Sequence, residues 1–240
     1  MKIHVQKVSK RFGAVQALRD VDMQAADGDL LLLTGANGSG KSTLLRILAT
    51  ALAPDEGRYL WNGLPLKQAL AEARHAVGFL DADGGSAFYE DLSAEENLAF
   101  WAQVYGAGPQ YGFSTRLEEV LDAWSLSEKS AQPVRTLSQG MRKRLGLARL
   151  MMQGSSLMLL DEPFNGLDSK NTSVLLSLLE RWKTRGKVIV VATHQPEILE
   201  SLATQHLEMR VQDTLSPHFL GHGNSVEPRG CHARPPARSQ

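Results

Sequence analysis

The chain has 240 residues and carries 26 Lys+Arg against 26 Asp+Glu, so its formal net charge is zero. Hydrophobic residues make up 42% and charged residues 22%, which is typical of a globular protein and excludes a largely disordered one. The single cysteine excludes an internal disulfide, no apolar run reaches the roughly 18 residues of a membrane span, and the balanced charge argues against broad nucleic-acid binding. With no secretory pattern at its start, the chain is expected in a reducing cytosol.

The first part of the chain predicts short strands around one helix. Lys2–Val8 alternates weakly, as a half-exposed strand does, and Asp29–Thr34 is an apolar run typical of a strand buried in a parallel sheet. Apolar residues at helical spacing follow over Lys41–Leu52 and stop before Pro54. Two further short strands are predicted at Arg58–Trp61 and Val77–Leu80.

From about residue 93 the pattern predicts helices. Ser93 and Glu96 have the spacing of a capping box, in which each side chain bonds the backbone N–H of the other residue. The helix that they begin extends to about Tyr105, and the glycine-rich segment Gly106–Gly112 predicts a loop. Further helices are predicted at Arg116–Trp124 and Ser138–Met152, so the stretch from about 93 to 150 is expected to be a helical insertion.

Strands return in the last third, and they alternate with helices. The strands are expected at Leu157–Leu160 and Lys187–Ala192, and the helices at Ser169–Lys183 and Pro196–Leu202. This alternation predicts an α/β fold with a parallel sheet. Residues 211–240 hold four of the ten prolines and no apolar periodicity, which predicts a disordered tail. Metal binding by His218, His222 and His232, or a docking peptide, remain alternatives for that tail.

A glycine-rich segment lies between a predicted strand and a predicted helix, with the spacing G-x-x-x-x-G-K-[ST] of a phosphate-binding loop. Glycines let the backbone wrap tightly and point N–H groups inward, and the helix N-terminus adds partial positive charge. The lysine can neutralise the β and γ phosphates, and the serine hydroxyl can hold Mg²⁺. A plain glycine turn before a core helix is the less favoured alternative. The residues assigned to ATP are Gly35, Ala36, Asn37, Gly38, Ser39, Gly40, Lys41, Ser42 and Thr43.

Two carboxylates and a histidine follow the two later apolar strands. A buried strand that ends directly in Asp161 and Glu162 is costly unless these groups serve a cation or a water. We expect Asp161 to bind Mg²⁺, and Glu162 to orient or deprotonate the attacking water. His194 can bond the γ-phosphate and that water, although a histidine at a strand end is also common as a structural group.

These motifs together resemble the ATP-binding subunit of ABC transporters, over residues 1 to about 210. Gly35–Ser42 is similar to Walker A, Leu157–Glu162 to Walker B with its glutamate, and Leu137–Met141 (LSQGM) to the signature LSGGQ. The resemblance implies that Lys41, Glu162 and the switch histidine His194 are catalytic. It also implies roles for Phe12 on adenine, for Asp168 in the D-loop, and for Ser138, Gln139, Gly140 and Met141 against the partner subunit's ATP.

The resemblance also implies an architecture and an assembly. It predicts a P-loop NTPase (RecA-like) parallel-sheet core with an antiparallel β edge and an inserted α-helical subdomain, all within residues 1–210. Two subunits, identical or related, are expected to close head to tail on two ATP molecules with Mg²⁺. A separate membrane permease is the implied partner, which would place the chain peripherally on the cytoplasmic face of the inner membrane.

Two departures from the family pattern stand out. In the signature, Gln139 replaces a glycine and Met141 replaces a glutamine. No glutamine lies between Gln68 and Gln103, where the family has its Q-loop glutamine after the strand Val77–Leu80. Asp81 follows that strand instead, and its carboxylate can offer an oxygen to Mg²⁺ or water, with a shorter arm.

The transported substrate is expected to depend on the permease. The segments Arg46–Thr50, Tyr89–Phe100 and Ala192–Gln195 are similar to haem-exporter ATPases of cytochrome c maturation, which we favour. Gly78–Leu98 is also similar to ATPases of drug and polysaccharide exporters. A soluble ABC ATPase of translation or DNA repair, and a cassette that binds ATP and regulates without turnover, remain alternatives.

Overall fold

The computed structural model describes residues 1–84, 88–106 and 113–211. A five-stranded sheet forms its centre, and its neighbouring strands all pair in parallel. These strands are buried apolar runs, apart from the more exposed edge strand β9, and they confirm the predicted parallel sheet. In sheet order they are β6 (Val77–Leu80), β7 (Leu157–Asp161), β8 (Val188–Ala192), β3 (Leu30–Thr34) and β9 (Gln205–Glu208).

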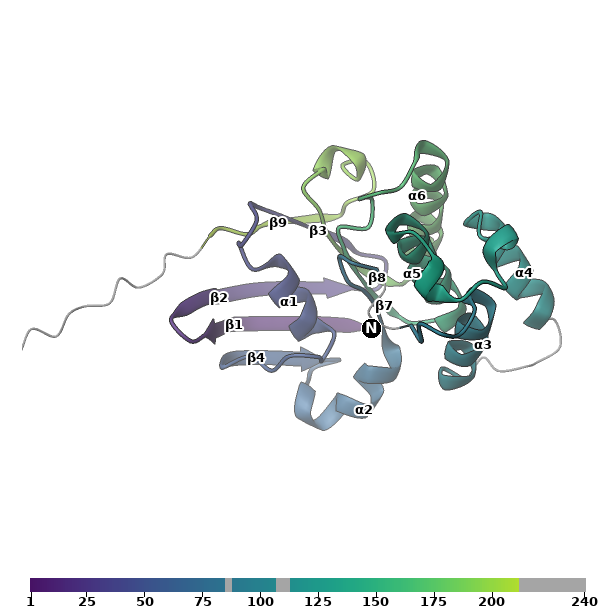
Figure 1. Cartoon of the computed structure of the whole chain (residues 1–240). Helices are drawn as coiled ribbons and strands as arrows, with labels where there is room; N and C mark the ends of the chain where they lie inside the picture. Colours follow the sequence, from purple (N-terminus) through teal and green to yellow (C-terminus); the bar gives the residue numbers. More distant parts are fainter. Residues whose placement is uncertain (85–87, 107–112, 212–240) are drawn as a thin grey trace, which may run out of the picture.

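A second, antiparallel sheet lies beside the first and supplies the expected antiparallel β edge (Figure 1). Its long pair β1–β2 is irregular, with register shifts between Val5 and Val8 and between Val8 and Lys10. Its strands, in sheet order, are β2 (Val15–Ala26), β1 (Lys2–Phe12), β4 (Glu56–Trp61) and β5 (Leu64–Pro65). Two helices accompany this sheet, α1 (Lys41–Leu48) and α2 (Leu66–Ala76).

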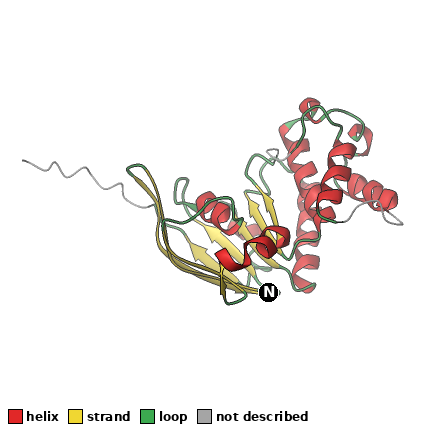
Figure 2. Cartoon of the chain, turned by 90° about the horizontal axis from the view of Figure 1, so that it is seen from below, coloured by secondary structure: helices red, strands yellow, loops and turns green. Residues whose placement is uncertain are grey.

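The remaining helices gather on the other side of the molecule, as Figure 2 shows. They are α3 (Ala94–Val104), α4 (Phe113–Ala123), α5 (Gln139–Gln153) and α6 (Ser169–Thr184), with short 3₁₀ turns at Ser127–Lys129, Val134–Thr136 and Pro196–Ile198. Helices α3, α4 and α5 pack on one another, and α5 also packs on β6. The capping box at the start of α3 is present: Glu96 N donates to Ser93 Oγ at 3.1 Å, and Ser93 N donates to Glu96 Oε2 at 2.7 Å.

The parallel sheet separates two hydrophobic cores. Alternate side chains of β3 enter opposite cores: Leu30 and Leu32 pack with α5 and α6, whereas Leu31 and Leu33 pack with α1 and the antiparallel sheet. This alternation follows from the two-residue period of a strand. Helices α1 and α5 therefore lie in different cores, on opposite faces of the sheet.

Two helix predictions are wrong in part. The segment Pro196–Leu202 forms only a 3₁₀ turn, because its N–H groups bond three residues back, as from Leu199 N to Pro196 O at 2.9 Å. The helix predicted over Lys41–Leu52 ends at Leu48, and Thr50 adopts φ +60°, a left-handed conformation that commonly follows a helix end. Strands β2, β5 and β9 and helix α2 were not predicted from the sequence.

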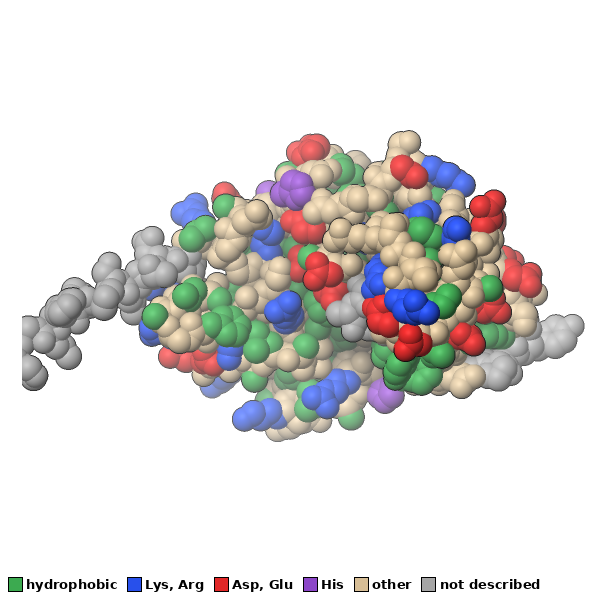
Figure 3. Space-filling model, viewed as in Figure 1, with side chains coloured by type: hydrophobic (Ala, Val, Ile, Leu, Met, Phe, Trp, Pro, Cys, Tyr) green, Lys and Arg blue, Asp and Glu red, His purple; other side chains and the backbone are tan. Residues whose placement is uncertain are grey.

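Within the described residues, no helix is long and apolar enough to cross a membrane. The predicted tail from residue 212 onward and most of the loop predicted at Gly106–Gly112 lie outside those residues. On the face seen in Figure 3, acidic and basic side chains are interspersed, as the balanced composition predicts.

Candidate functional site

The glycine-rich segment connects β3 directly to α1, as predicted. Three of its residues have positive φ: Gly35 at +135°, Gly38 at +81° and Gly40 at +96°. Gly40 is the N-cap of α1, and no side chain of the described residues caps that helix end. The free N–H groups of the first turn and the helix dipole can therefore act on an anion.

At two of these positions a side chain is excluded by close neighbouring backbone as well as by the positive φ. A Cβ on Gly40 would lie 2.4 Å from the carbonyl oxygen of Ala17, in β2. A Cβ on Gly35 would lie 2.1 Å from the carbonyl oxygen of Met209, just after β9. The loop is thus held between strand β2 and the chain just after β9, and neither β2 nor β9 was predicted from the sequence.

The lysine of the loop is folded against its backbone. Lys41 is 7% exposed, and its Nζ donates to the carbonyl oxygens of Gly35 at 2.6 Å and Ala36 at 3.2 Å. Ser39 is buried as well, and its hydroxyl has no partner within the described part of the chain. A buried hydroxyl without a partner is costly, and a ligand oxygen at the loop can satisfy it.

The side chains of Ser42 and Asp161 lie near each other in the structure, although the two residues are far apart in the sequence. Asp161 is the last residue of β7 and is 3% exposed. Burial raises the pKa of its carboxyl, and the hydrogen bond from the Ser42 side chain opposes that rise. A buried carboxylate beside a hydroxyl is an oxygen pair that suits Mg²⁺.

Glu162 and His194 also meet. Glu162 Oε2 lies 2.8 Å from His194 Nδ1, and Gln195 Nε2 lies 3.2 Å from His194 Nε2. An ionised carboxylate only accepts hydrogen bonds, so Nδ1–H is the donor in the contact with Glu162. The side chains are 15% and 52% exposed, so this pair faces solvent, unlike Asp161.

All these groups lie at one edge of the parallel sheet. The phosphate loop follows β3, Asp161 ends β7 and Glu162 follows it, and His194 follows β8. Strands β7, β8 and β3 are consecutive in the sheet, so the three motifs meet at neighbouring carboxyl ends. Carboxyl ends of parallel strands are where α/β proteins place their ligands.

The signature segment begins α5, in the other core. Ser138 is the N-cap, and its Oγ accepts from Met141 N at 3.3 Å. Ser138 and Gln139 are exposed, whereas Met141 packs partly against the core of α5. A Cβ on Gly140 would lie 3.1 Å from the carbonyl oxygen of Gly166, so the signature adjoins the D-loop segment.

Asp168 caps the next helix. Its Oδ1 accepts from Asn171 N and from Asn171 Nδ2, both at 2.8 Å, and the backbone bond lowers the pKa of its carboxyl. Asp168 is therefore the N-cap of α6 and stabilises the start of that helix. Any contact with a nucleotide or a partner is additional to that role.

Phe12 is the last residue of β1 and pairs with Val15 across the turn to β2. Both residues are 50% exposed, so Phe12 is not part of a hydrophobic core. Lys10 Nζ lies 5.7 Å from the centre of its ring. The face of Phe12 is accessible to a planar ligand, from the hairpin that also supports Gly40.

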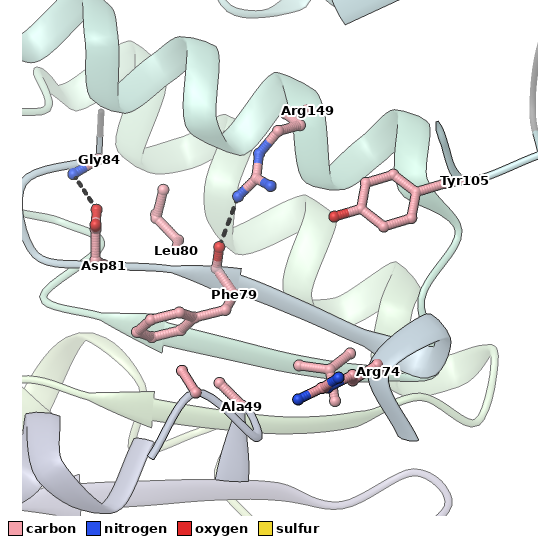
Figure 4. Close-up of a pocket in the computed structure, with 10 residues that line it drawn as sticks. Ala49, Arg74, Phe79, Leu80, Asp81, Gly84, Tyr105 and Arg149 are labelled. Atoms are coloured by element: carbon pink, nitrogen blue, oxygen red, sulfur yellow. Dashed lines mark hydrogen bonds between the residues drawn. The ribbon is translucent and has the colours of Figure 1, made fainter. Parts of the chain in front are cut away.

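Asp81, where the family has its Q-loop, closes a turn. Its Oδ1 accepts from Gly84 N at 2.8 Å, a bond visible in Figure 4. The turn borders a cavity of about 240 Å³ between β6, the chain after α1, the ends of α2 and α3, and α5, into which Arg149 and Tyr105 also point. Arg149 Nη2 donates to Phe79 O at 2.7 Å.

The basic residues after the signature form hydrogen bonds and an ion pair with other parts of the same chain. Arg142 pairs with Glu90 at 2.5 and 2.7 Å, Lys143 Nζ donates to Glu162 O at 2.8 Å, and Arg144 Nη1 donates to Trp124 O at 2.9 Å. The sequence predicts the helix Ser138–Met152 but does not single out Lys143. No signal marks it, because a lysine on a helix usually lies in solvent.

The phosphate loop, the carboxylate pair and the histidine, on a parallel sheet of this order, define a P-loop ATPase. The sequence profile of the family described as ABC transporter matches residues 18–165. The chain therefore belongs to the ABC transporter family, as an ATP-binding subunit of the kind that hydrolyses ATP and works with a membrane permease.

Comparison with known relatives agrees with this family assignment. The chain is 36% identical over 193 residues to "Cytochrome c biogenesis ATP-binding export protein CcmA 2" of Cupriavidus metallidurans, covering 80% of this chain and 89% of that protein. It is 40% identical over 178 residues to the CcmA protein of Rhodospirillum rubrum, covering 73% and 72%. A solved "ATP binding subunit of ABC transporter" superposes with a TM-score of 0.79 at 26% identity, covering 90% of each chain.

Proposed function

We propose that this chain binds ATP with Mg²⁺ at the carboxyl ends of β3, β7 and β8 and hydrolyses it there. The observation that carries the proposal is the meeting of the phosphate loop, Asp161, Glu162 and His194 at that edge. The phosphates are held by the loop N–H groups and Lys41, and the adenine stacks on the exposed ring of Phe12. The loop residues are those predicted, Gly35 through Thr43.

Ser42 and Asp161 fit a magnesium ion. Mg²⁺ is typically bound by one or two protein oxygens together with substrate phosphates, and the Ser42 side chain lies near enough to Asp161 to oppose the rise in the pKa of its carboxyl. Burial raises the pKa of Asp161, so a cation nearby favours its ionised form. When bound, the ion neutralises charge on the β and γ phosphates.

Glu162 acts on the attacking water in this proposal. Its carboxylate accepts the proton as the water oxygen forms a bond to the γ-phosphorus, and the bond to the β–γ bridging oxygen breaks to leave ADP and phosphate. His194 holds the carboxylate through Nδ1. Lys41 supplies positive charge to the phosphate oxygens, which requires it to leave its loop carbonyls.

We infer that two copies, or one copy and a related cassette, close on two nucleotides. The signature helix α5 and the phosphate-loop helix α1 belong to cores on opposite faces of the sheet. The exposed N-terminus of α5, with Ser138 and Gln139, suits an anion presented by another subunit. ATPase rate per subunit should then rise with protein concentration, and a rate independent of dilution in a verified monomer would refute the dimer.

We also propose that the permease belongs to an exporter for cytochrome c biogenesis, with haem as its substrate, and that the chain works at the cytoplasmic face of the inner membrane. The relatives at 36% and 40% identity support this branch, and the sequence segments singled out above agree with it. A relative at 28% identity, the "ABC transporter ATP-binding protein NatA" of Bacillus subtilis, keeps other transporters as the alternative.

Deletion of the gene in its host tests the branch. We expect holo-cytochromes c to disappear, and to return with the wild-type gene but not with Glu162→Gln. Normal cytochrome c levels in the deletion strain would reject the cytochrome assignment and leave the ATPase assignment standing.

A further inference from the structure

Lys143 is an unusual residue in α5, because it is 3% exposed although it carries an amine. Burial lowers its pKa, and the carboxylates of Glu162, Asp161, Asp83 and Asp81 act in the opposite direction. A buried charge of this kind is retained only where it is paired or hydrogen-bonded. Its Nζ donates 2.8 Å to the carbonyl oxygen of Glu162.

Glu162 needs such support, because its φ is +47°. A residue with a Cβ adopts this left-handed conformation only at a cost in free energy. The N–H of Glu162 donates to Ala192 O at 2.8 Å, which fixes the peptide before its Cα. The bond from Lys143 fixes the peptide after it, with Asn165 N as a second, longer donor to the same oxygen at 3.3 Å.

We propose that Lys143 is a positioning residue for ATP hydrolysis: it holds the backbone of Glu162 in its left-handed conformation, so that the carboxylate is aimed at the attacking water. This inference rests on the proposed role of Glu162. Among the described residues, Lys143 hydrogen-bonds neither the carboxylate nor the phosphate loop, and it acts through the Glu162 carbonyl.

The position of Lys143 depends in turn on the turn that replaces the Q-loop. A Cβ on Gly84 would lie 2.7 Å from the Cα of Lys143, and a Cβ on Gly146 would lie 2.8 Å from the carbonyl oxygen of Gly84. The Asp81–Gly84 turn therefore lies directly on α5, with no side chain between them. A displacement of that turn would move Lys143 and, through it, Glu162.

The test compares two lysine-to-methionine variants, which remove the amine and keep the chain length. Lys187 is the matched control: burial also lowers its pKa, and its Nζ also donates to a backbone carbonyl, that of Ser155, just before β7. It lies at the amino end of β8, opposite the edge that carries Glu162. Lys143→Met should lower kcat about 10- to 100-fold with KM for MgATP within about twofold, while Lys187→Met keeps kcat.

Amide exchange provides a readout that does not need turnover. A peptide spanning residues 159–166 should exchange about tenfold faster in Lys143→Met than in the wild type, and at the wild-type rate in Lys187→Met. Wild-type kcat in a folded Lys143→Met variant, or equal exchange in both variants, would overturn the inference. If the wild type shows no ATPase activity, or if Glu162→Gln leaves that activity unchanged, the proposed function fails. Amide exchange then still decides whether Lys143 holds the Glu162 backbone.

Discussion

His194 Nδ1 lies 2.8 Å from Glu162 Oε2, with the two residues at the ends of adjacent strands β8 and β7. A histidine that follows a strand is also common as a structural group, and the contact with Glu162 is the observation that favours a role for His194 at the site. The pair holds a carboxylate at the edge of the sheet where the phosphate loop also lies.

Replacement of the glutamate should separate binding from turnover. In Glu162→Gln the side chain keeps its shape but no longer accepts a proton, so kcat should fall at least about 100-fold while MgATP affinity stays within about threefold. His194→Ala should lower kcat less, because it removes only the group that orients the carboxylate. Phosphate release and equilibrium nucleotide binding measure the two effects, and unchanged phosphate release by Glu162→Gln would reject its role.

Two glycines of the phosphate loop form a matched pair for a stability test. Both have positive φ, but a Cβ on Gly38 would meet no described residue within 4 Å, whereas a Cβ on Gly40 would lie 2.4 Å from Ala17 O. Gly38→Ala should cost about 1 kcal/mol from conformation alone. Gly40→Ala should cost about 2–4 kcal/mol, because the backbone of β2 must also move. Equal midpoints in urea unfolding would show that β2 does not constrain the loop.

Much of the fold follows from apolar patterning, and the differences have physical reasons. The strands β3, β7 and β8 are continuous apolar runs, so their burial is visible in the sequence. The edge strand β9 alternates between half-buried and exposed residues, and α2 buries only Ala69 and Ala73, so neither has a strong apolar signal. In β2, the bulges against β1 break the two-residue period.

The motifs of the candidate site could be predicted from the sequence, but the residues that pack against those motifs could not. Spacing and residue type identify the phosphate loop, Asp161 and Glu162, because the chemistry needs those groups in that order. That Gly40 lies on Ala17, or that Lys143 bonds the Glu162 carbonyl, depends on which strands and helices become adjacent. Those contacts join parts of the chain with no local sequence relationship.

The capping box of α3 predicts a specific acid sensitivity. The backbone hydrogen bond from Ser93 lowers the pKa of the Glu96 carboxyl. Since its folded pKa is below its unfolded value, Glu96 contributes stability above the unfolded pKa, and that contribution is lost as pH falls through the folded pKa. The Tm of Glu96→Gln should therefore fall less than that of the wild type between pH 6 and about 3.

Glu95 is the control for that experiment, because it lies beside Glu96 in the first turn of α3 without a part in the capping box. Glu95→Gln should keep the wild-type loss of Tm on acidification. If both variants lose Tm equally, the capping box does not govern the acid response of this helix.

The central claim, that the loop ahead of Lys41 binds the phosphates of ATP, is tested most directly by calorimetric titration of MgATP into the wild type and into Lys41→Ala. Lys41 is the only loop side chain expected to place a full positive charge on the phosphates, so we predict saturable binding to the wild type and at least about a 100-fold weaker Kd in the variant. Equal affinity in two folded proteins, or no binding by the wild type, would contradict the account.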